Sequence, residues 1–89
     1  MNEVDNMLEV RGSSYGDWPI QSQVSQSIKR AMKHSPNWPK LPPPHRESLE
    51  MIAVKISRIL NGDYNHADSW EDIAGYATLA ERICNSEAE

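Results

Sequence analysis

Apolar residues recur at helical spacing through most of the stretch from His45 to Arg82, and this pattern limits the possible folds more than any other feature of the chain. On a helix of 3.6 residues per turn they fall on one side of each half of the stretch. The first set is Leu49, Ile52, Ala53, Ile56, Ile59 and Leu60, and the second is Trp70, Ile73, Ala74, Ala77, Ala80 and Cys84. Asn61-Gly62 is a helix stop signal. The stretch therefore predicts a helical hairpin with two buried apolar stripes and a turn over Gly62–Ala67.

The preceding part of the chain predicts two more helices. Spacing of apolar residues predicts a short helix over Glu3–Val10 and a longer one over Ile20–His34. Between them, Arg11–Pro19 holds two glycines, two serines and a proline, which predict a loop. Five of the six prolines lie in Ser35–Pro44, so this segment is expected to be a stiff connector whose Trp38 packs onto the body.

These elements predict an all-α fold, a compact bundle of one short and three longer helices, with a proline-rich connector before the hairpin. The 89 residues form a single domain, with a core over about residues 3–84 and a short, polar, frayed tail after Cys84. A chain of this length buries a modest core. Because Met51, Val54 and Leu79 lie on the charged sides of their helices, we expect them to be covered by a ligand or by another copy in a homo-oligomer.

Charge is distributed unevenly along the chain. The formal net charge is −4, yet residues 28–58 carry seven bases and two acids, whereas the segments on either side are acidic. Duplex nucleic acid favours broad positive surfaces, so it is not an expected partner. A small phosphate-bearing ligand fits a single basic segment better.

Reactive and targeting features are few. The single cysteine, Cys84, excludes an internal disulfide framework, and its place on the apolar stripe predicts a buried, inert thiol. The three histidines have no Ser or Cys partner at a suggestive spacing, so nucleophilic catalysis is not expected. No leader and no bilayer-length apolar run is present, which predicts a cytoplasmic protein that does not enter a membrane.

The predicted loop before the second helix carries groups that suit a nucleotide. Arg11 and the amides around Gly16 suit a phosphate, while the rings of Tyr15 and Trp18 suit a base, with Asp17 between them. The alternative is an ordinary loop at a helix entry whose two rings cover the core. Lys55, Arg58 and Tyr76 of the hairpin are further candidates for phosphate and base.

Acidic residues form a pair on each helix of the hairpin. Glu47 and Glu50 are three residues apart, and Asp68 and Asp72 are four apart. If the four carboxylates converge, they would hold Mg²⁺, which takes oxygen ligands and bridges to substrate phosphates. The alternative is that acids near helix N-termini only complement the helix dipole and form salt bridges. Mid-helix Gly75 costs about 1 kcal/mol relative to alanine, which favours a close approach to the backbone there.

Three segments together resemble a family of small uncharacterised phage and prophage proteins. They are Arg11-Gly12 with Tyr15-Gly16-Asp17, the run Lys55-Ile56-Ser57-Arg58-Ile59-Leu60, and Asp68-Ser69-Trp70-Glu71-Asp72-Ile73-Ala74-Gly75-Tyr76. The resemblance covers about Glu9 to Cys84 and implies a phage-type protein acting in the bacterial host cell.

More distantly, the chain is similar to MazG-like all-α nucleotide pyrophosphohydrolases, which hold magnesium with a Glu-x-x-Glu and a Glu-x-x-Asp helix. That similarity implies metal roles for Glu47, Glu50 and Asp72. Ser69 stands where the second glutamate is expected, and Asp68 replaces it only with a shifted geometry.

The leading expectation is non-catalytic capture of a small nucleotide, of the cyclic-oligonucleotide or ADP-ribose type, by an anti-defence sponge that needs no cofactor. One alternative is a magnesium-dependent nucleoside triphosphate pyrophosphohydrolase. The other is a structural or interaction protein whose charged faces pair with each other.

Overall fold

The computed structural model describes residues 3–88, with side chains over residues 3–10 and 16–86. Within this range the chain forms the helices α1 (Glu3–Tyr15), α2 (Trp18–Lys33), α3 (Pro43–Asn61) and α4 (Ala67–Ala88), and a short 3-10 turn, η1 (Trp38–Lys40). The described residues contain no strand. The predicted all-α fold of one short and three longer helices is confirmed.

The three longer helices begin close to where the sequence signals place them. A proline lies in the first turn of both α2 and α3, where its missing N–H costs no helical hydrogen bond. The helix α3 ends at Asn61, and the amide of Gly62 donates to the carbonyl oxygen of Arg58. The helix α4 continues to Ala88, four residues beyond Cys84, where the sequence indicates the start of a polar tail.

The predicted loop over Arg11–Pro19 is also wrong, because α1 continues through Tyr15 and only Gly16 and Asp17 separate it from α2. Gly16 has a φ of 86°, the left-handed conformation that commonly ends a helix and that glycine adopts without steric cost. A Cβ atom at Gly16 would overlap the backbone carbonyl of Asn61. Helix termination is therefore set by this one glycine, whereas Gly12 and the serine pair are tolerated within the helix.

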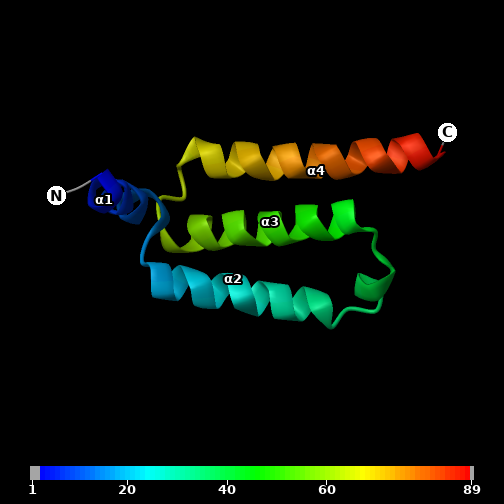
Figure 1. The fold of residues 1–89 in the computed structure, drawn as a ribbon, viewed down its shortest axis with the longest axis horizontal. Coiled ribbons are helices and arrows are strands. Elements are labelled where there is room, and N and C mark those ends of the chain that lie inside the picture. The colour runs from blue at the N-terminus through cyan, green and yellow to red at the C-terminus, as the bar shows by residue number, and fades with distance from the viewer. Residues whose placement is uncertain (1–2, 89) are drawn as a thin grey trace.

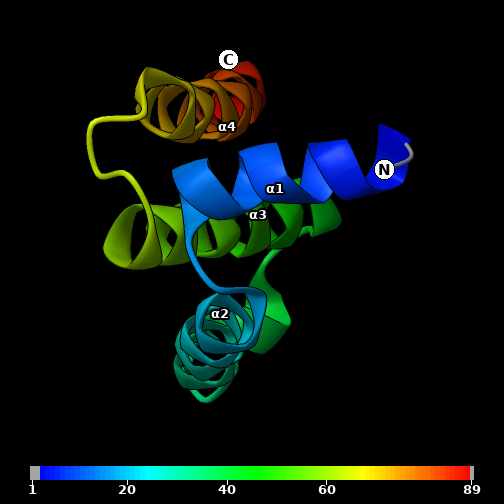
Figure 2. The ribbon, with the colours of Figure 1, turned by 90° about the vertical axis from the view of Figure 1, so that its left-hand side faces the viewer.

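The long helices lie side by side in one layer with α3 in the middle, as Figure 1 shows. Two ion pairs join α3 to its neighbours. Lys33 of α2 contacts Glu50 at 3.6 Å, and Lys55 contacts Asp72 of α4 at 2.8 Å. Helix α1 crosses the end of the layer at which α3 ends and α4 begins (Figures 1 and 2). Consecutive long helices are antiparallel, as in the predicted hairpin.

Burial in this layer differs from the prediction. Among the described side chains, Ala53 is the one buried apolar residue. The other buried side chains are polar or charged. Leu60 and Trp70, both assigned to buried stripes, are 66% and 55% exposed. The prediction of a buried thiol is wrong as well, because Cys84 is exposed. A helix in the middle of a single layer has neighbours on two sides only, so its remaining two sides stay open.

The proline-rich connector is held against the start of α3, which confirms that Trp38 packs onto the body. The guanidinium of Arg46 donates to the carbonyl oxygens of Trp38 and Pro39, at 3.2 and 2.9 Å. It also lies 5.9 Å from the centroid of the Trp38 ring, within the range of a cation–π contact.

Among the described residues, no helix combines the length and the apolar character that crossing a membrane requires.

Candidate functional site

One broad side of the α3–α4 hairpin collects most of the hairpin residues that the sequence singled out. We call it the charged face and define it by its α3 and α4 residues, which share a side by helical register. They are Glu47, Met51, Val54 and Arg58 of α3 and Asp72, Gly75, Tyr76 and Leu79 of α4. Lys55 lies at its border, between the two helices. The structure therefore brings together Lys55, Arg58, Asp72 and Tyr76, four of the predicted site residues.

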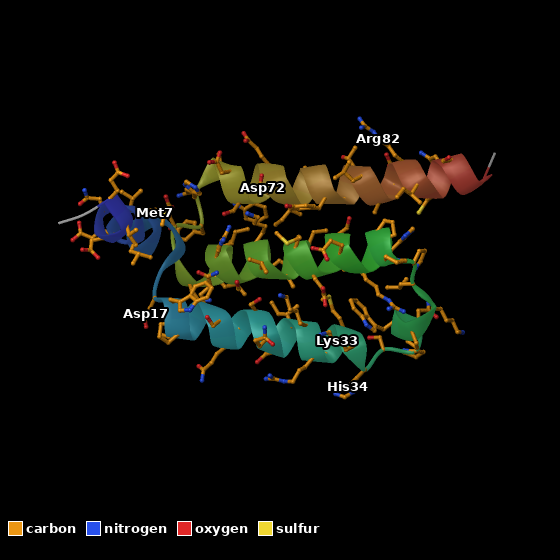
Figure 3. The ribbon with its side chains drawn as sticks, in the orientation of Figure 1. Met7, Asp17, Lys33, His34, Asp72 and Arg82 are labelled. Atoms are coloured by element: carbon orange, nitrogen blue, oxygen red, sulfur yellow. The ribbon has the colours of Figure 1, made fainter. Side chains whose placement is uncertain are left out.

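The ion pair between Lys55 and Asp72 is the electrostatic centre of this face. The Lys55 side chain is 11% exposed, whereas that of Asp72 is 47% exposed. Asp72 points from α4 toward α3 (Figure 3). A hydrogen bond from the Lys55 ammonium, with the charges of Lys55 and Arg58, lowers the pKa of the Asp72 carboxyl below its ordinary value. Asp72 is therefore ionised at neutral pH and neutralises a largely buried cation.

Gly75 is an exposed position in the middle of α4 with no structural need for glycine. A Cβ atom there would meet no atom within 4 Å apart from its chain neighbours and the backbone of its own helix. Gly75 lines a shallow groove of about 520 Å³ along α4, together with Asp72, Tyr76, Leu79 and Arg82. Helical glycine is unfavourable in such a place, so its presence is explained if another molecule approaches the backbone of α4.

The candidates from the predicted loop belong to the last turns of α1, the junction with α2 and the first residue of α2, and Gly16 of this junction lies against the C-terminal end of α3. The side chains of Arg11 and Tyr15 lie outside the described side chains. Gly16 packs against the backbone of Asn61, which already accounts for the glycine at that position. Asp17 and Trp18 are exposed at the start of α2, and the whole residue Trp18 is 69% exposed, so its side chain does not cover a core.

The four carboxylates predicted to share Mg²⁺ do not converge. Among the described residues no three His, Cys, Asp or Glu side chains are grouped as a metal site. In an antiparallel hairpin the starts of α3 and α4 lie at opposite ends, and the contact of Asp72 with Lys55 fixes this register. Glu47 is eight residues before Lys55, which places it about 12 Å along the helix axis from that contact. The prediction combined two helix N-termini that the fold separates, so the carboxylates present do not fit a shared magnesium ion.

Sequence reasoning missed two features. The Nε2 atom of His45 lies 3.3 Å from the Sγ atom of Cys84, although the two residues are 39 positions apart. Only the register of the hairpin reveals this pair, since no local spacing signals it. Arg82 was not assigned to the site, yet it lines the groove beside Gly75 and extends on the side away from α3 (Figure 3). The sequence does contain a signal for Arg82, because its spacing of seven residues from Gly75 is about two helical turns and places both residues on one side of α4.

Comparison with known proteins places the chain in a family without a described activity. No curated protein matches the chain. No solved structure matches it either. A family profile described as a domain of unknown function, DUF6378, matches residues 1–84. This match spans nearly the whole chain, and the chain therefore belongs to the DUF6378 family.

Proposed function

We propose that this protein binds a small nucleotide on the charged face and holds it without hydrolysing it. The observation that carries the proposal is Gly75, an exposed mid-helix glycine that nothing in the fold requires. Glycine at such a place leaves backbone atoms open to a ligand, at a cost to the helix of about 1 kcal/mol. The residues around it supply the chemistry that a nucleotide needs.

In this proposal the phosphate is bound by Arg58, whose planar guanidinium matches phosphate oxygens. Lys55 stays with Asp72, so their pair orients the site and adds little net charge. Tyr76 is half-buried four residues after Asp72, and its aromatic ring suits stacking with a base. Arg82 stands at the outer edge of the groove, where it suits a second phosphate group.

The ligand class we propose is a cyclic-oligonucleotide or ADP-ribose signal, in keeping with the resemblance to small phage proteins. A nucleotide held and not cleaved would then be removed from the signalling pool of a bacterial host. The separation of Glu47 and Glu50 from Asp72 supports capture over magnesium-dependent hydrolysis, because the described residues hold no group of three or more His, Cys, Asp or Glu side chains that could position a metal ion.

The test is incubation of the purified protein with nucleoside triphosphates, cyclic di- and trinucleotides and ADP-ribose derivatives, with magnesium present. Free ligand and ligand released by heat are then separated by chromatography. The proposal expects one class to disappear from solution and to return chemically intact after denaturation. Conversion to a monophosphate and pyrophosphate contradicts it in favour of an enzyme, and full recovery of every free nucleotide contradicts it in favour of a structural protein.

A further inference from the structure

The two sides of α3 that face its neighbours are identified by the ion pairs. Lys55 contacts α4, and Ser48, seven residues earlier, lies buried on the same side. Glu50 contacts α2, and the fully buried Ser57 follows it by seven residues on that side. These two sides are roughly opposite on the helix, so α3 has two open sides, one of which belongs to the charged face.

The other open side of α3 is apolar, and both neighbours continue it. Val24 of α2 is nine residues from Lys33 and thus diametrically opposite to it, while Trp70 of α4 lies on the flank opposite to Asp72. The contact between His45 and Cys84 joins α3 and α4 on this same side. We call the surface the apolar face, made of Ile20, Val24 and Ile28 of α2, Leu49, Ile52, Ile56 and Leu60 of α3, and Trp70, Ala77 and Cys84 of α4.

The large residues of the apolar face are exposed or half-buried in the single chain, and none of them is fully buried. Ile20 is 51% exposed and Leu49 is 39% exposed. Val24, Ile28, Ile52 and Ile56 are half-buried. A face of this kind across three adjacent helices marks an interaction site rather than scattered surface apolar residues.

The dimensions of the chain show that it exposes more surface than a compact monomer, enough for an interface of standard size. Its accessible surface is 6336 Å², against about 5300 Å² expected for a compact monomer of this mass. Its radius of gyration is 15.2 Å, against about 12 Å for a compact chain of this length. The excess surface, roughly 1000 Å², is similar to the ~800 Å² that each partner contributes to a standard interface.

We propose that a second copy of the chain covers the apolar face, so that two layers pack with their α3 helices at the centre. The described side chains bury a single apolar residue, so the partner has to be present whenever the chain folds, and a second copy meets that condition. The residues that define the apolar face are uncharged, and Glu81 of α4, four residues after Ala77, lies at its outer edge by helical register. A two-fold interface centred on the α3 helices, in which each residue set meets itself, therefore brings no like charges together at its centre. The charged faces then point outward on both sides of the dimer.

The first test measures the mass of the full chain in solution by sedimentation over a range of concentrations. The expected mass is about twice 10.1 kDa, with dissociation only on dilution. A monomer at every concentration overturns the proposal.

The second test locates the interface with thiol labelling in a Cys84→Ser background. Leu49→Cys places a thiol on the apolar face, and the matched control Leu79→Cys places one on the charged face, where Leu79 is 54% exposed. Both are mild substitutions at exposed helix positions. The Leu49→Cys variant should react at least tenfold more slowly than the Leu79→Cys variant, and its rate should rise on dilution. Equal rates, or protection at position 79 alone, contradict the assignment of the face.

Discussion

Gly75 links the stability of the helix to the proposed function at the scale of one residue. Its exposure, the open space around it and its place in the groove of α4 are independent of any ligand. Glycine at position 75 therefore lowers the stability of the free protein. A ligand that comes close to the backbone needs this open position. A substitution at Gly75 should therefore raise the stability of the free protein and weaken the binding of the ligand.

Replacing Gly75 with alanine should raise the free energy of unfolding by about 1 kcal/mol, because alanine is the better helix former. The same variant should bind the nucleotide more weakly, because its methyl group occupies the ligand's approach. Urea denaturation gives the first quantity and calorimetric titration gives the second. A variant that is more stable and binds as tightly as the wild type would remove Gly75 from the site.

Replacing Arg58 with alanine should weaken nucleotide binding by about 1.5–3 kcal/mol, the usual range for a lost charged hydrogen bond. Arg30→Ala is the matched control, since Arg30 is an exposed arginine on α2. The control should keep the wild-type affinity. Equal losses in the two variants would indicate unspecific attraction of an anion.

The lowered pKa of Asp72 gives the pair with Lys55 a defined pH dependence. A carboxyl whose folded pKa is below its unfolded pKa adds stability above the unfolded value, near pH 4, and this contribution disappears as the pH falls through the folded pKa. Asp72→Asn should therefore lower the urea midpoint at pH 7, and the difference from the wild type should shrink in acid. Glu71→Gln, with the same change of charge on the same helix, is the control. A constant difference down to pH 2 would mean that the pair is not the cause.

At the scale of elements, local sequence patterns predicted where the longer helices lie, because helix formation depends on interactions between residues close in the sequence. Apolar periodicity and the prolines located α2, α3 and α4 to within a few residues, apart from the longer C-terminal end of α4. The end of α1 was mispredicted because Gly12 and two serines were taken as helix breakers. The chain turns only at Gly16, the glycine with a positive φ. A left-handed glycine cannot be told from a tolerated helical one by composition.

Packing between elements was the part that the sequence did not predict. A stripe such as Leu49 to Leu60 indicates a helix with an apolar side, but it does not say whether that side meets another helix of the same chain. The register of the hairpin, visible in the contacts of Asp72 and Cys84, also depends on the whole fold. For this reason the carboxylates were wrongly combined, whereas Lys55, Arg58, Asp72 and Tyr76 do share one face.

Gly16 tests the junction of α1 with the layer. Gly16→Ala places a Cβ in the left-handed conformation, at a cost of about 1–2 kcal/mol, and against the carbonyl of Asn61. The free energy of unfolding should fall by at least that amount in urea denaturation, opposite in sign to the effect of the same substitution at Gly75. Unchanged stability would mean that α1 does not pack on the end of α3 in this way.

At the scale of the whole molecule, the layer has two broad faces of different chemistry. Within the described part of the chain the apolar face stays open, and the charged face carries the paired Lys55 and Asp72 with an open groove beside them. Association through the first face leaves the second accessible. Assembly and ligand binding are therefore assigned to opposite sides of α3 and α4, and each assignment can fail without the other.

Native mass spectrometry of the purified protein with the nucleotide panel tests this account most directly. We predict a species of about twice 10.1 kDa that carries two intact nucleotides, one for each charged face. A dimer that takes up no nucleotide would contradict the proposed function and keep the interface. A single chain would contradict the proposed interface, and a nucleotide bound to that single chain would still support the charged face as the ligand site.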